Sequence, residues 1–448
     1  MKIFKLYSRI PLIYLNLGGF ILGCAGGLFL YWLGGRLGGN FLDTVTSILA
    51  PFGNILVSML KMIVMPIIVC TLISGAAALP LKTFGKMGLA VCGWYFFTSL
   101  FAAFFGSGIA MFFDPSLSVA PDKLLDDSLR SKAAEMAEKS SESGNAFLDI
   151  LYSLFSNPFE ALAEGNFLPV IVFSILFGLA ARMVMDVASE KGDAGTKQQI
   201  NSMLEICEAL QKTIFKIVDW VLKYFPIGVF ALTAFCFAKF GVALFQSYLQ
   251  VAGCVICGIL LMIVICYPLM VWIICRENPF PVIWKMREPI LTAFVTRSSA
   301  AALPVSMKTA TEKLHIKKEL SGFTLSLGST VNMDGVCIHL PVFAVLAANL
   351  FGFEMTFNQI LLMVLGVVFA SVGAGGIPGG SVFLLFLVLS GFNLTQEQTS
   401  VIVALALGIN PLLDMFETAC NVTGDNVGNY IIGKRMNMIE KTPETKEL

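Results

Sequence analysis

Charged residues are scarce in this sequence. Asp, Glu, Lys and Arg make up 13% of the 448 residues, whereas hydrophobic residues make up 56%. A soluble domain is closer to one quarter charged, so the composition indicates a polytopic membrane protein. The formal net charge is zero, and without a basic face a nucleic-acid partner is not expected.

Histidine is scarcer still, because His315 and His339 are the only two. A histidine metal centre is therefore not expected. The eleven cysteines are scattered through apolar runs, and the one CxxC, Cys254 to Cys257, lies inside an apolar segment. Buried thiols acting as small hydrophobes are favoured there over a redox or metal site. No short apolar region with a small-residue cleavage site precedes the first long apolar run, so no removed signal peptide is expected.

Long apolar runs, by contrast, are abundant. Runs of roughly 20 apolar residues mark membrane-spanning helices, and they predict spans at 11–33, 44–78, 84–113, 167–186, 200–237 and 242–275. The polar segment 114–145 is interpreted as a solvated loop. Basic residues concentrate before the first span and after the second, fourth, sixth and last, which predicts that both termini are cytoplasmic. We expect a multi-pass protein of the cell (inner) membrane.

The pattern changes after residue 276. Two apolar segments are interrupted, 281–309 at TRSSAAALP and 355–392 at SVGAGGIPGGS, and long apolar helices follow them at 319–350 and 396–432. Two broken segments in matching positions are typical of a transporter with its binding site at mid-membrane. Small residues and proline at the tips let the backbone turn back. The alternative is a pair of ordinary kinked spans.

The last apolar helix carries a stripe of polar residues at i, i+3, i+4, i+7 and i+11: Asp414, Glu417, Thr418, Asn421 and Asp425. At this spacing they share one helix face. An intramembrane aspartate costs about 2.5–3.5 kcal/mol, so three carboxylates cost on the order of 8 kcal/mol together. The stripe must therefore face protein, water or cations rather than lipid. Pro411, one turn upstream, predicts a kink and a free carbonyl.

A second polar cluster, GSTVNMDGV at 328–336, places Asn332 and Asp334 in an otherwise apolar helix beside a glycine that can unwind it. Carboxylate, amide and carbonyl oxygens are the ligands of hard cations. Asp334 and Asp425, each beside an asparagine, therefore suggest separate sodium sites. The alternative is a set of buried polar groups that only fix helix packing, and two such pairs beside two broken hairpins make it less favoured.

Together these motifs resemble the glutamate transporter family, the dicarboxylate/amino acid:cation symporters. The matching stretches are TRSSAAALP, NMDG at 332–335, GIPGG at 376–380, NVTGD at 421–425, LKMIVMP at 60–66, WYFFTS at 94–99 and FPIGVF at 225–230. The resemblance covers nearly the whole chain. It implies an all-α membrane protein with eight transmembrane helices plus two re-entrant helical hairpins, inverted repeats and an elevator-type transport mechanism, assembled as a homotrimer in the lipid bilayer.

The same resemblance implies a division into domains. The scaffold would comprise 1–83 and 114–240, and the transport domain 84–113, 241–280 and its core 281–432, followed by a cytoplasmic tail at 433–448. The expected activity is sodium-coupled symport of an amino acid. Neither an enzyme nor a cofactor is expected, and Na⁺ is the coupling ion.

The family's cation ligands carry over residue by residue. One sodium site would use Tyr95, Thr98, Ser99, Asn332 and Asp334. A second would use backbone oxygens of Gly328, Asn332 and Asn421 with the Asp425 carboxylate. A third would use backbone oxygens around Thr330, Met333, Ser371, Val372 and Ala374. Every side-chain ligand of these sets is present, which favours sodium over proton coupling.

The substrate contacts carry over less evenly. Asp414 matches the residue that holds the substrate α-ammonium, and the α-carboxylate matches are Asn421 and the backbone at Ser298, Ser299 and Ile377. The full predicted substrate set is Arg297, Ser298, Ser299, Val336, Ile377, Ser381, Asp414, Glu417, Thr418 and Asn421. Members that carry acidic substrates have arginine in place of Glu417, threonine in place of Val336 and glycine in place of Ser381.

The exchange at Glu417 inverts the local charge. A glutamate substrate would place two carboxylates a few ångströms apart, which costs several kcal/mol at an effective dielectric of about 20. Aspartate and glutamate are therefore not the predicted substrates. Arg297, in the tip of the first hairpin, is placed to pair with either Asp414 or Glu417. If Glu417 pairs with Arg297, a neutral polar substrate such as Ser, Thr, Ala, Gln or cystine fits. If Glu417 is free and ionised, a cationic or hydrogen-bonding side chain fits. We favour the neutral polar class over a cationic amino acid.

Two other classes fit less well. An aspartyl protease dyad is expected in YD and GxGD contexts with a PAL motif, whereas the contexts here are MDG and VTGD. An ion channel needs rings of one charge sign along a path, whereas these charges cluster near two hairpins. An uncoupled anion leak beside transport stays open. Asn393 and Asn421 begin glycosylation patterns, which we discount because the second lies in the membrane stripe.

Overall fold

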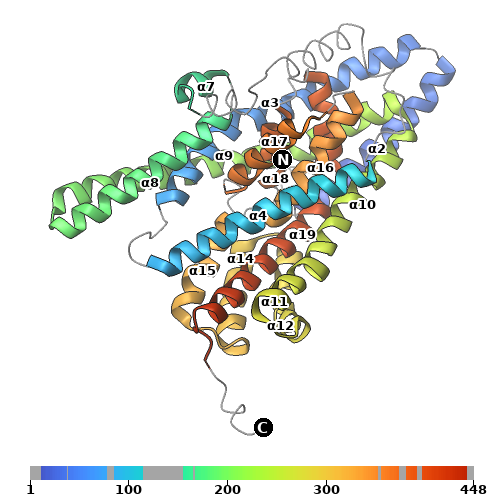
Figure 1. The fold of residues 1–448 in the computed structure, drawn as a ribbon. Helices are drawn as coiled ribbons and strands as arrows, with labels where there is room; N and C mark the ends of the chain where they lie inside the picture. The colour runs from blue at the N-terminus through green and yellow to red at the C-terminus, as the bar shows by residue number, and fades with distance from the viewer. Residues whose placement is uncertain are drawn as a thin grey trace, which may run out of the picture.

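The structure is a computed structural model that describes residues 12–37, 39–77, 85–114, 155–164, 167–351, 355–372, 380–390 and 396–440. Most of the predicted loop 114–145 lies outside these residues. Within the described part the chain is helical, apart from turns and one isolated antiparallel bridge between Ile316 and Ile439. Figure 1 shows the helices as one elongated assembly.

Eight helical spans in the described residues are long and apolar enough to cross a membrane. They are α2 (Leu12–Leu37), α3 (Gly39–Ala77), α4 (Gly85–Phe113), α8 (Phe167–Lys191), α9 (Ala194–Phe240), α10 (Ala243–Leu261) continued through η2 (Met262–Cys266) into α11 (Tyr267–Cys275), α15 (Lys318–Val331) with α16 (Asp334–Phe351), and α19 (Gln396–Arg435). Each of the predicted spans is confirmed, and most extend a few residues further. A short helix, α7 (Pro158–Glu164), precedes α8.

Helices α2, α3, α8 and α9 pack mainly on one another. Gly19, Gly23 and Gly27 on α2 follow one another at four-residue spacing, and a Cβ on any of them would stand within 2.9 Å of α9 backbone. Small residues at this spacing let two membrane helices approach closely. In Figure 1, α8 and the first part of α9 run side by side away from the rest of the molecule.

The remaining helices form a second packing group around α16 and α19. In the most apolar window of Lys318–Phe351 94% of the residues are buried, and in that of Gln398–Arg435 78%, compared with 17% for Tyr14–Leu37. The two spans that carry the polar clusters are therefore the most enclosed. A carboxylate on them is shielded from lipid by protein.

The first interrupted segment forms α12 (Pro279–Lys285), α13 (Arg287–Thr296) and α14 (Ser299–Lys308), followed by the π-helical η3 (Thr309–Lys313). Helices α13 and α14 pack against each other and against α19. The break falls at Arg297, which has a left-handed backbone with φ 55°. Ser298 then caps α14 by accepting a hydrogen bond from the Ala301 N–H at 3.3 Å. The predicted break at TRSSAAALP is confirmed.

The second interrupted segment forms α17 (Phe357–Ser371) and α18 (Gly380–Ser390), which also pack together. Its tip at 373–379 lies outside the described residues. That the two segments form re-entrant hairpins stays a prediction.

The predicted unwinding near Asp334 is confirmed, because α15 ends at Val331 and α16 begins at Asp334. Asn332 between them has an extended backbone, with φ −95° and ψ 102°. Helix α19, in contrast, runs unbroken through Pro411. The distal end of α19 is held by Tyr430 and Lys434, which both donate hydrogen bonds to Glu277 in the α11–α12 loop.

Candidate substrate and cation sites

The polar stripe of α19 is buried along its whole length. Its five residues, Asp414, Glu417, Thr418, Asn421 and Asp425, are between 1% and 5% exposed. The stripe therefore faces protein, as the cost of intramembrane carboxylates requires.

Asp334 lies at the centre of a cluster of hydroxyl groups. Ser99 Oγ donates to Asp334 Oδ1 at 3.1 Å, and Tyr267 OH donates to Asp334 Oδ2 at 2.6 Å. Thr98 Oγ1 donates to Asn332 Oδ1 at 3.2 Å. The structure thus brings together Thr98, Ser99, Asn332 and Asp334 as predicted. It adds Tyr267, which the sequence did not single out.

Asp425 adjoins this cluster through one amide, because Asn332 Nδ2 donates to Asp425 Oδ1 at 3.1 Å. Tyr95 OH donates to the Thr324 carbonyl at 2.7 Å. A Cβ on Gly328 would stand 2.4 Å from Asp425 Oδ1 and 2.5 Å from Tyr95 OH, so these three predicted ligands meet where only glycine fits. The two predicted sodium sites are therefore neighbours that share Asn332.

The charges of this cluster fit a bound cation. Among the described residues, neither Asp334 nor Asp425 has a Lys, Arg or His within ion-pair distance, although other buried carboxylates do. Both are almost fully buried, at 0% and 3% exposed. Burying an unpaired carboxylate is costly, and the surrounding hydroxyl, amide and carbonyl oxygens are the donors that hard cations prefer. Na⁺ is suited to this set.

The structure places only some of the residues predicted to form the third sodium site. Thr330 and Met333 flank the break between α15 and α16, and Ser371 and Val372 stand at the end of α17. Ala374 lies outside the described residues. This set stays a prediction.

Arg297 settles one of the alternatives left open by the sequence. Its Nε and Nη2 both contact Asp414 Oδ2, at 2.8 and 2.7 Å, and the two side chains are 16% and 6% exposed. The partner of Arg297 is thus Asp414 rather than Glu417. Beside this pair, Thr418 Oγ1 donates to the Asp414 carbonyl at 2.7 Å.

Glu417 has a different partner, His339 of α16, whose Nδ1 contacts Glu417 Oε1. Both side chains are 1% exposed. The second carboxylate oxygen, Oε2, is buried and has no hydrogen-bond partner among the described residues. Ser299 Oγ at the start of α14 is likewise buried without a partner. Sequence reasoning missed His339 because a lone histidine in an apolar helix has no local signature.

The other predicted substrate residues are placed as follows. Asn421 Oδ1 accepts the Gly335 N–H at 2.7 Å, so this amide is engaged by the start of α16. Ser381 Oγ donates to Asn410 Oδ1 at 3.3 Å, and Val336 is buried on α16. Ile377 lies outside the described residues.

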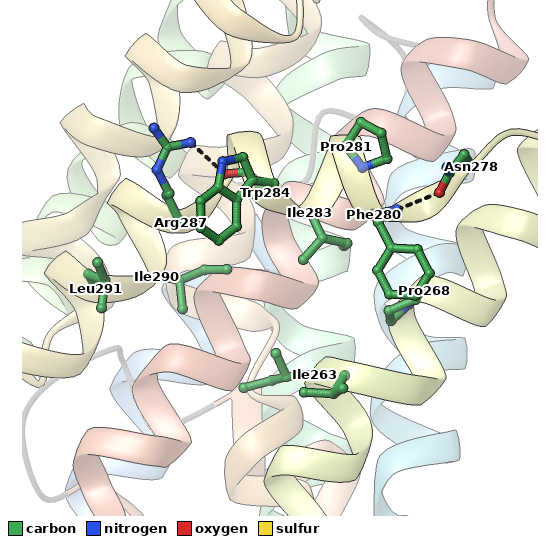
Figure 2. Close-up of a pocket in the computed structure, with 11 residues that line it drawn as sticks. Ile263, Pro268, Asn278, Phe280, Pro281, Ile283, Trp284, Arg287, Ile290 and Leu291 are labelled. Carbon is green, nitrogen blue, oxygen red and sulfur yellow. Dashed lines mark hydrogen bonds between the residues drawn. The ribbon is translucent and has the colours of Figure 1, made fainter.

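A pocket of about 730 Å³ lies elsewhere, between the η2–α11 segment and α12–α13 (Figure 2). Apart from the Trp284 indole, the described residues that line it include two with polar side chains, Asn278 and Arg287. They bond locally, to the Phe280 N–H at 3.1 Å and the Trp284 carbonyl at 2.9 Å. None of the predicted site residues lines this pocket, so it is not a candidate amino-acid site.

Within the described residues, Asp334 and Asp425 are buried without a cationic side chain at ion-pair distance, on enclosed helices beside interrupted ones, and this arrangement fits a membrane transporter that binds cations. The sequence comparison gives the family. The chain belongs to the sodium:dicarboxylate symporter family, whose pattern matches residues 12–435.

Its relatives include several amino acid transporters. The neutral amino acid transporter B(0) of Mus musculus is 30% identical over 416 residues, covering 84% of this chain and 72% of that protein. The excitatory amino acid transporter 3 of Mus musculus is 29% identical over 424 residues, covering 85% and 78%. The serine/threonine transporter SstT of Bifidobacterium adolescentis is 28% identical over 395 residues, covering 86% of each chain.

Proposed function

We propose that this protein imports a neutral polar amino acid together with Na⁺, and that Glu417 selects the substrate side chain. The observation that carries the proposal is the buried Glu417 Oε2, which has no hydrogen-bond partner in the part of the chain that the structure describes. A buried acceptor without a donor is costly, and a substrate hydroxyl or amide supplies the donor.

The amino-acid head group binds beside Glu417 on the same face of α19. Asp414 lies three residues before Glu417 and accepts the α-ammonium, sharing its charge with Arg297. The α-carboxylate binds at the N-terminus of α14, where Ser298 caps the helix and backbone N–H groups carry partial positive charge. Asn421, Thr418, Val336, Ser381 and the backbone at Ile377 complete the site.

Acidic substrates are rejected by charge. A substrate carboxylate about 4 Å from an ionised Glu417 meets a repulsion of about 4 kcal/mol at an effective dielectric of 20. This corresponds to a loss of roughly 10³ in affinity. Neutral substrates also agree with the names of two relatives, the neutral amino acid transporter B(0) and the serine/threonine transporter SstT. A cationic amino acid is the second candidate, because an ionised Glu417 also attracts an ammonium or guanidinium group.

Na⁺ binds at two neighbouring sites centred on Asp334 and Asp425, and at the third site near Thr330 and Ser371. Moving one charge through 100 mV releases about 2.3 kcal/mol, so coupled sodium ions drive steep accumulation of the substrate.

The two packing groups correspond to a scaffold and a transport domain. Helices α2, α3, α8 and α9 supply the scaffold, residues 1–83 and 114–240, through which three protomers associate. Residues 84–113 and 241–280, with the core 281–432, form the transport domain. This domain carries the site across the inner membrane by an elevator movement, with both termini in the cytoplasm.

Uptake into proteoliposomes tests the proposal. Labelled serine should accumulate only with an inward Na⁺ gradient. Unlabelled threonine, alanine and glutamine should compete, whereas aspartate, glutamate, lysine and arginine should not. Equal uptake when choline replaces Na⁺ refutes sodium coupling, and competition by lysine or arginine alone assigns the cationic class instead.

A further inference from the structure

The contact between His339 and Glu417 depends on a close approach of two helices. A Cβ on Gly335 would stand 2.4 Å from the Glu417 carbonyl oxygen and 2.7 Å from its Cα. The missing side chain therefore lets α16 lie against the backbone of α19. His339 follows Gly335 by four residues and lies one turn further along the same face, where the imidazole reaches the Glu417 carboxylate.

The imidazole is held on two sides. Its Nδ1 contacts Glu417 Oε1, and the ring of Phe343, one turn further along α16, lies 4.8 Å away between centroids at an angle of 44°. Both His339 and Glu417 are 1% exposed, so solvent does not compete for their contact. One carboxylate oxygen is thus bound by the imidazole, and the other has no partner among the described residues.

Glu417, which carries this oxygen, lies on the same polar stripe of α19 as the proposed ammonium contact Asp414. Asp414 and Thr418 lie three residues before and one residue after Glu417 on the same stripe, and Arg297 from the α13–α14 break contacts this stripe through Asp414. A donor that reaches Glu417 Oε2 would therefore come from a molecule bound beside Asp414. A donor satisfies a buried acceptor that otherwise costs stability.

We infer that His339 is a specificity-determining positioning residue: it holds Glu417 Oε1 so that Oε2 is presented to a substrate side chain with an O–H or N–H donor. The inference rests on the proposed function and specifies which feature of the substrate the site recognises, a hydrogen-bond donor on its side chain. Serine, threonine and glutamine carry the donor, and alanine lacks it. A site whose acceptor is fixed and buried discriminates against a substrate that leaves this acceptor unpaired.

Three variants of the full-length protein test this role. His339→Leu removes the donor to Oε1. His339→Asn keeps an N–H near the position of Nδ1. His315→Asn makes the same exchange at the other histidine, where the left-handed backbone of φ 54° is one that asparagine tolerates. Each variant is purified, and its unfolding temperature is measured with Na⁺ alone and with Na⁺ plus serine, threonine, glutamine or alanine. Uptake competition in proteoliposomes is measured in parallel.

We expect wild type and His315→Asn to bind serine about tenfold more tightly than alanine, since one hydrogen bond to a charged group is worth about this factor. His339→Leu should lose this preference while its alanine affinity and its stabilisation by Na⁺ alone stay within about twofold of wild type. His339→Asn should restore most of the preference.

A pair that only fixes the packing of α16 on α19 gives a different result. His339→Leu then weakens the binding of serine, alanine and Na⁺ alike, and this outcome overturns the inference. An unchanged ratio of serine affinity to alanine affinity overturns it as well. Failure of the proposed function can be told apart from failure of this inference, because it shows in the substrates that the wild-type protein takes up. If wild type takes up lysine rather than serine, the neutral class is wrong. The inference is then judged by whether His339→Leu changes the lysine-to-alanine ratio.

Discussion

Gly328→Ala tests the place where the two proposed sodium sites meet. The added Cβ would stand 2.4 Å from Asp425 Oδ1 and 2.5 Å from Tyr95 OH. Both atoms are already bonded, to Asn332 Nδ2 at 3.1 Å and to the Thr324 carbonyl at 2.7 Å. Ordinary contact begins near 3.4 Å, so the carboxylate must withdraw by about 1 Å. Its hydrogen bond to Asn332 then lengthens to about 4 Å and is lost.

The magnitude follows from that lost hydrogen bond. A hydrogen bond to a charged group contributes about 1.5–3 kcal/mol, and each 1.4 kcal/mol is about tenfold in affinity. We therefore expect the affinity for Na⁺ to fall roughly 10- to 100-fold. Alanine favours a helix over glycine by about 1 kcal/mol, so the unfolding temperature without Na⁺ is not the informative quantity.

The assay is a Na⁺ titration of the unfolding temperature of purified protein, with choline keeping the ionic strength constant. Gly322→Ala is the matched control, because it changes the same helix at a position where a Cβ meets nothing within 4 Å. Its Na⁺ midpoint should equal that of wild type. An unchanged midpoint in Gly328→Ala would refute the assignment of Asp425 and Tyr95 to a cation site.

Three further predictions concern other parts of the molecule. Tyr267→Phe removes the hydroxyl that donates to Asp334 at 2.6 Å, so the Na⁺ midpoint should rise about tenfold or more; an unchanged midpoint would place Tyr267 outside the site. Arg297→Asn introduces a residue that tolerates the left-handed backbone but removes the guanidinium that pairs with the buried Asp414 carboxylate, at a cost of about 3–5 kcal/mol. The protein without substrate should be less stable, and serine, whose ammonium replaces the guanidinium, should raise the unfolding temperature more than in wild type; an equal or smaller rise contradicts this. Partial burial raises the pKa of Glu277, but its hydrogen bonds to the lysine and tyrosine at the end of α19 outweigh this and lower it below the ordinary 4.5. Its stabilising effect is therefore present above pH 4.5 and lost as the pH falls through the lowered pKa. Glu277→Gln should lower the unfolding temperature at pH 7, and this difference from wild type should shrink as the pH falls below 4.5.

The sequence was most informative where the signal was local. The polar stripe of α19 follows from helical spacing alone, and all five of its residues are buried on that helix. The break at Asn332 follows from a glycine beside two polar residues in an apolar run. The break at Arg297 and Ser298 follows from a short polar interruption between two apolar stretches.

The pairings across the site could not be predicted in the same way. His339 and Glu417 are 78 residues apart, and Tyr267 and Asp334 are 67 apart. Neither contact leaves a local pattern, because a tyrosine or histidine in an apolar helix is usually part of the core. The choice between Asp414 and Glu417 as the partner of Arg297 was open for the same reason, since both carboxylates lie on one helix face.

The segment that follows α19 has a practical consequence for handling this protein. Residues 436–440 return along the start of α15, where Lys317 N–H donates to the Met438 carbonyl at 2.9 Å and Glu440 N–H donates to the His315 carbonyl at 2.8 Å. An affinity tag or fluorescent fusion joined directly after Arg435 would replace this segment. Attachment after Glu440 leaves it intact, so the choice of junction decides whether a tagged preparation keeps the native anchoring of its last helix.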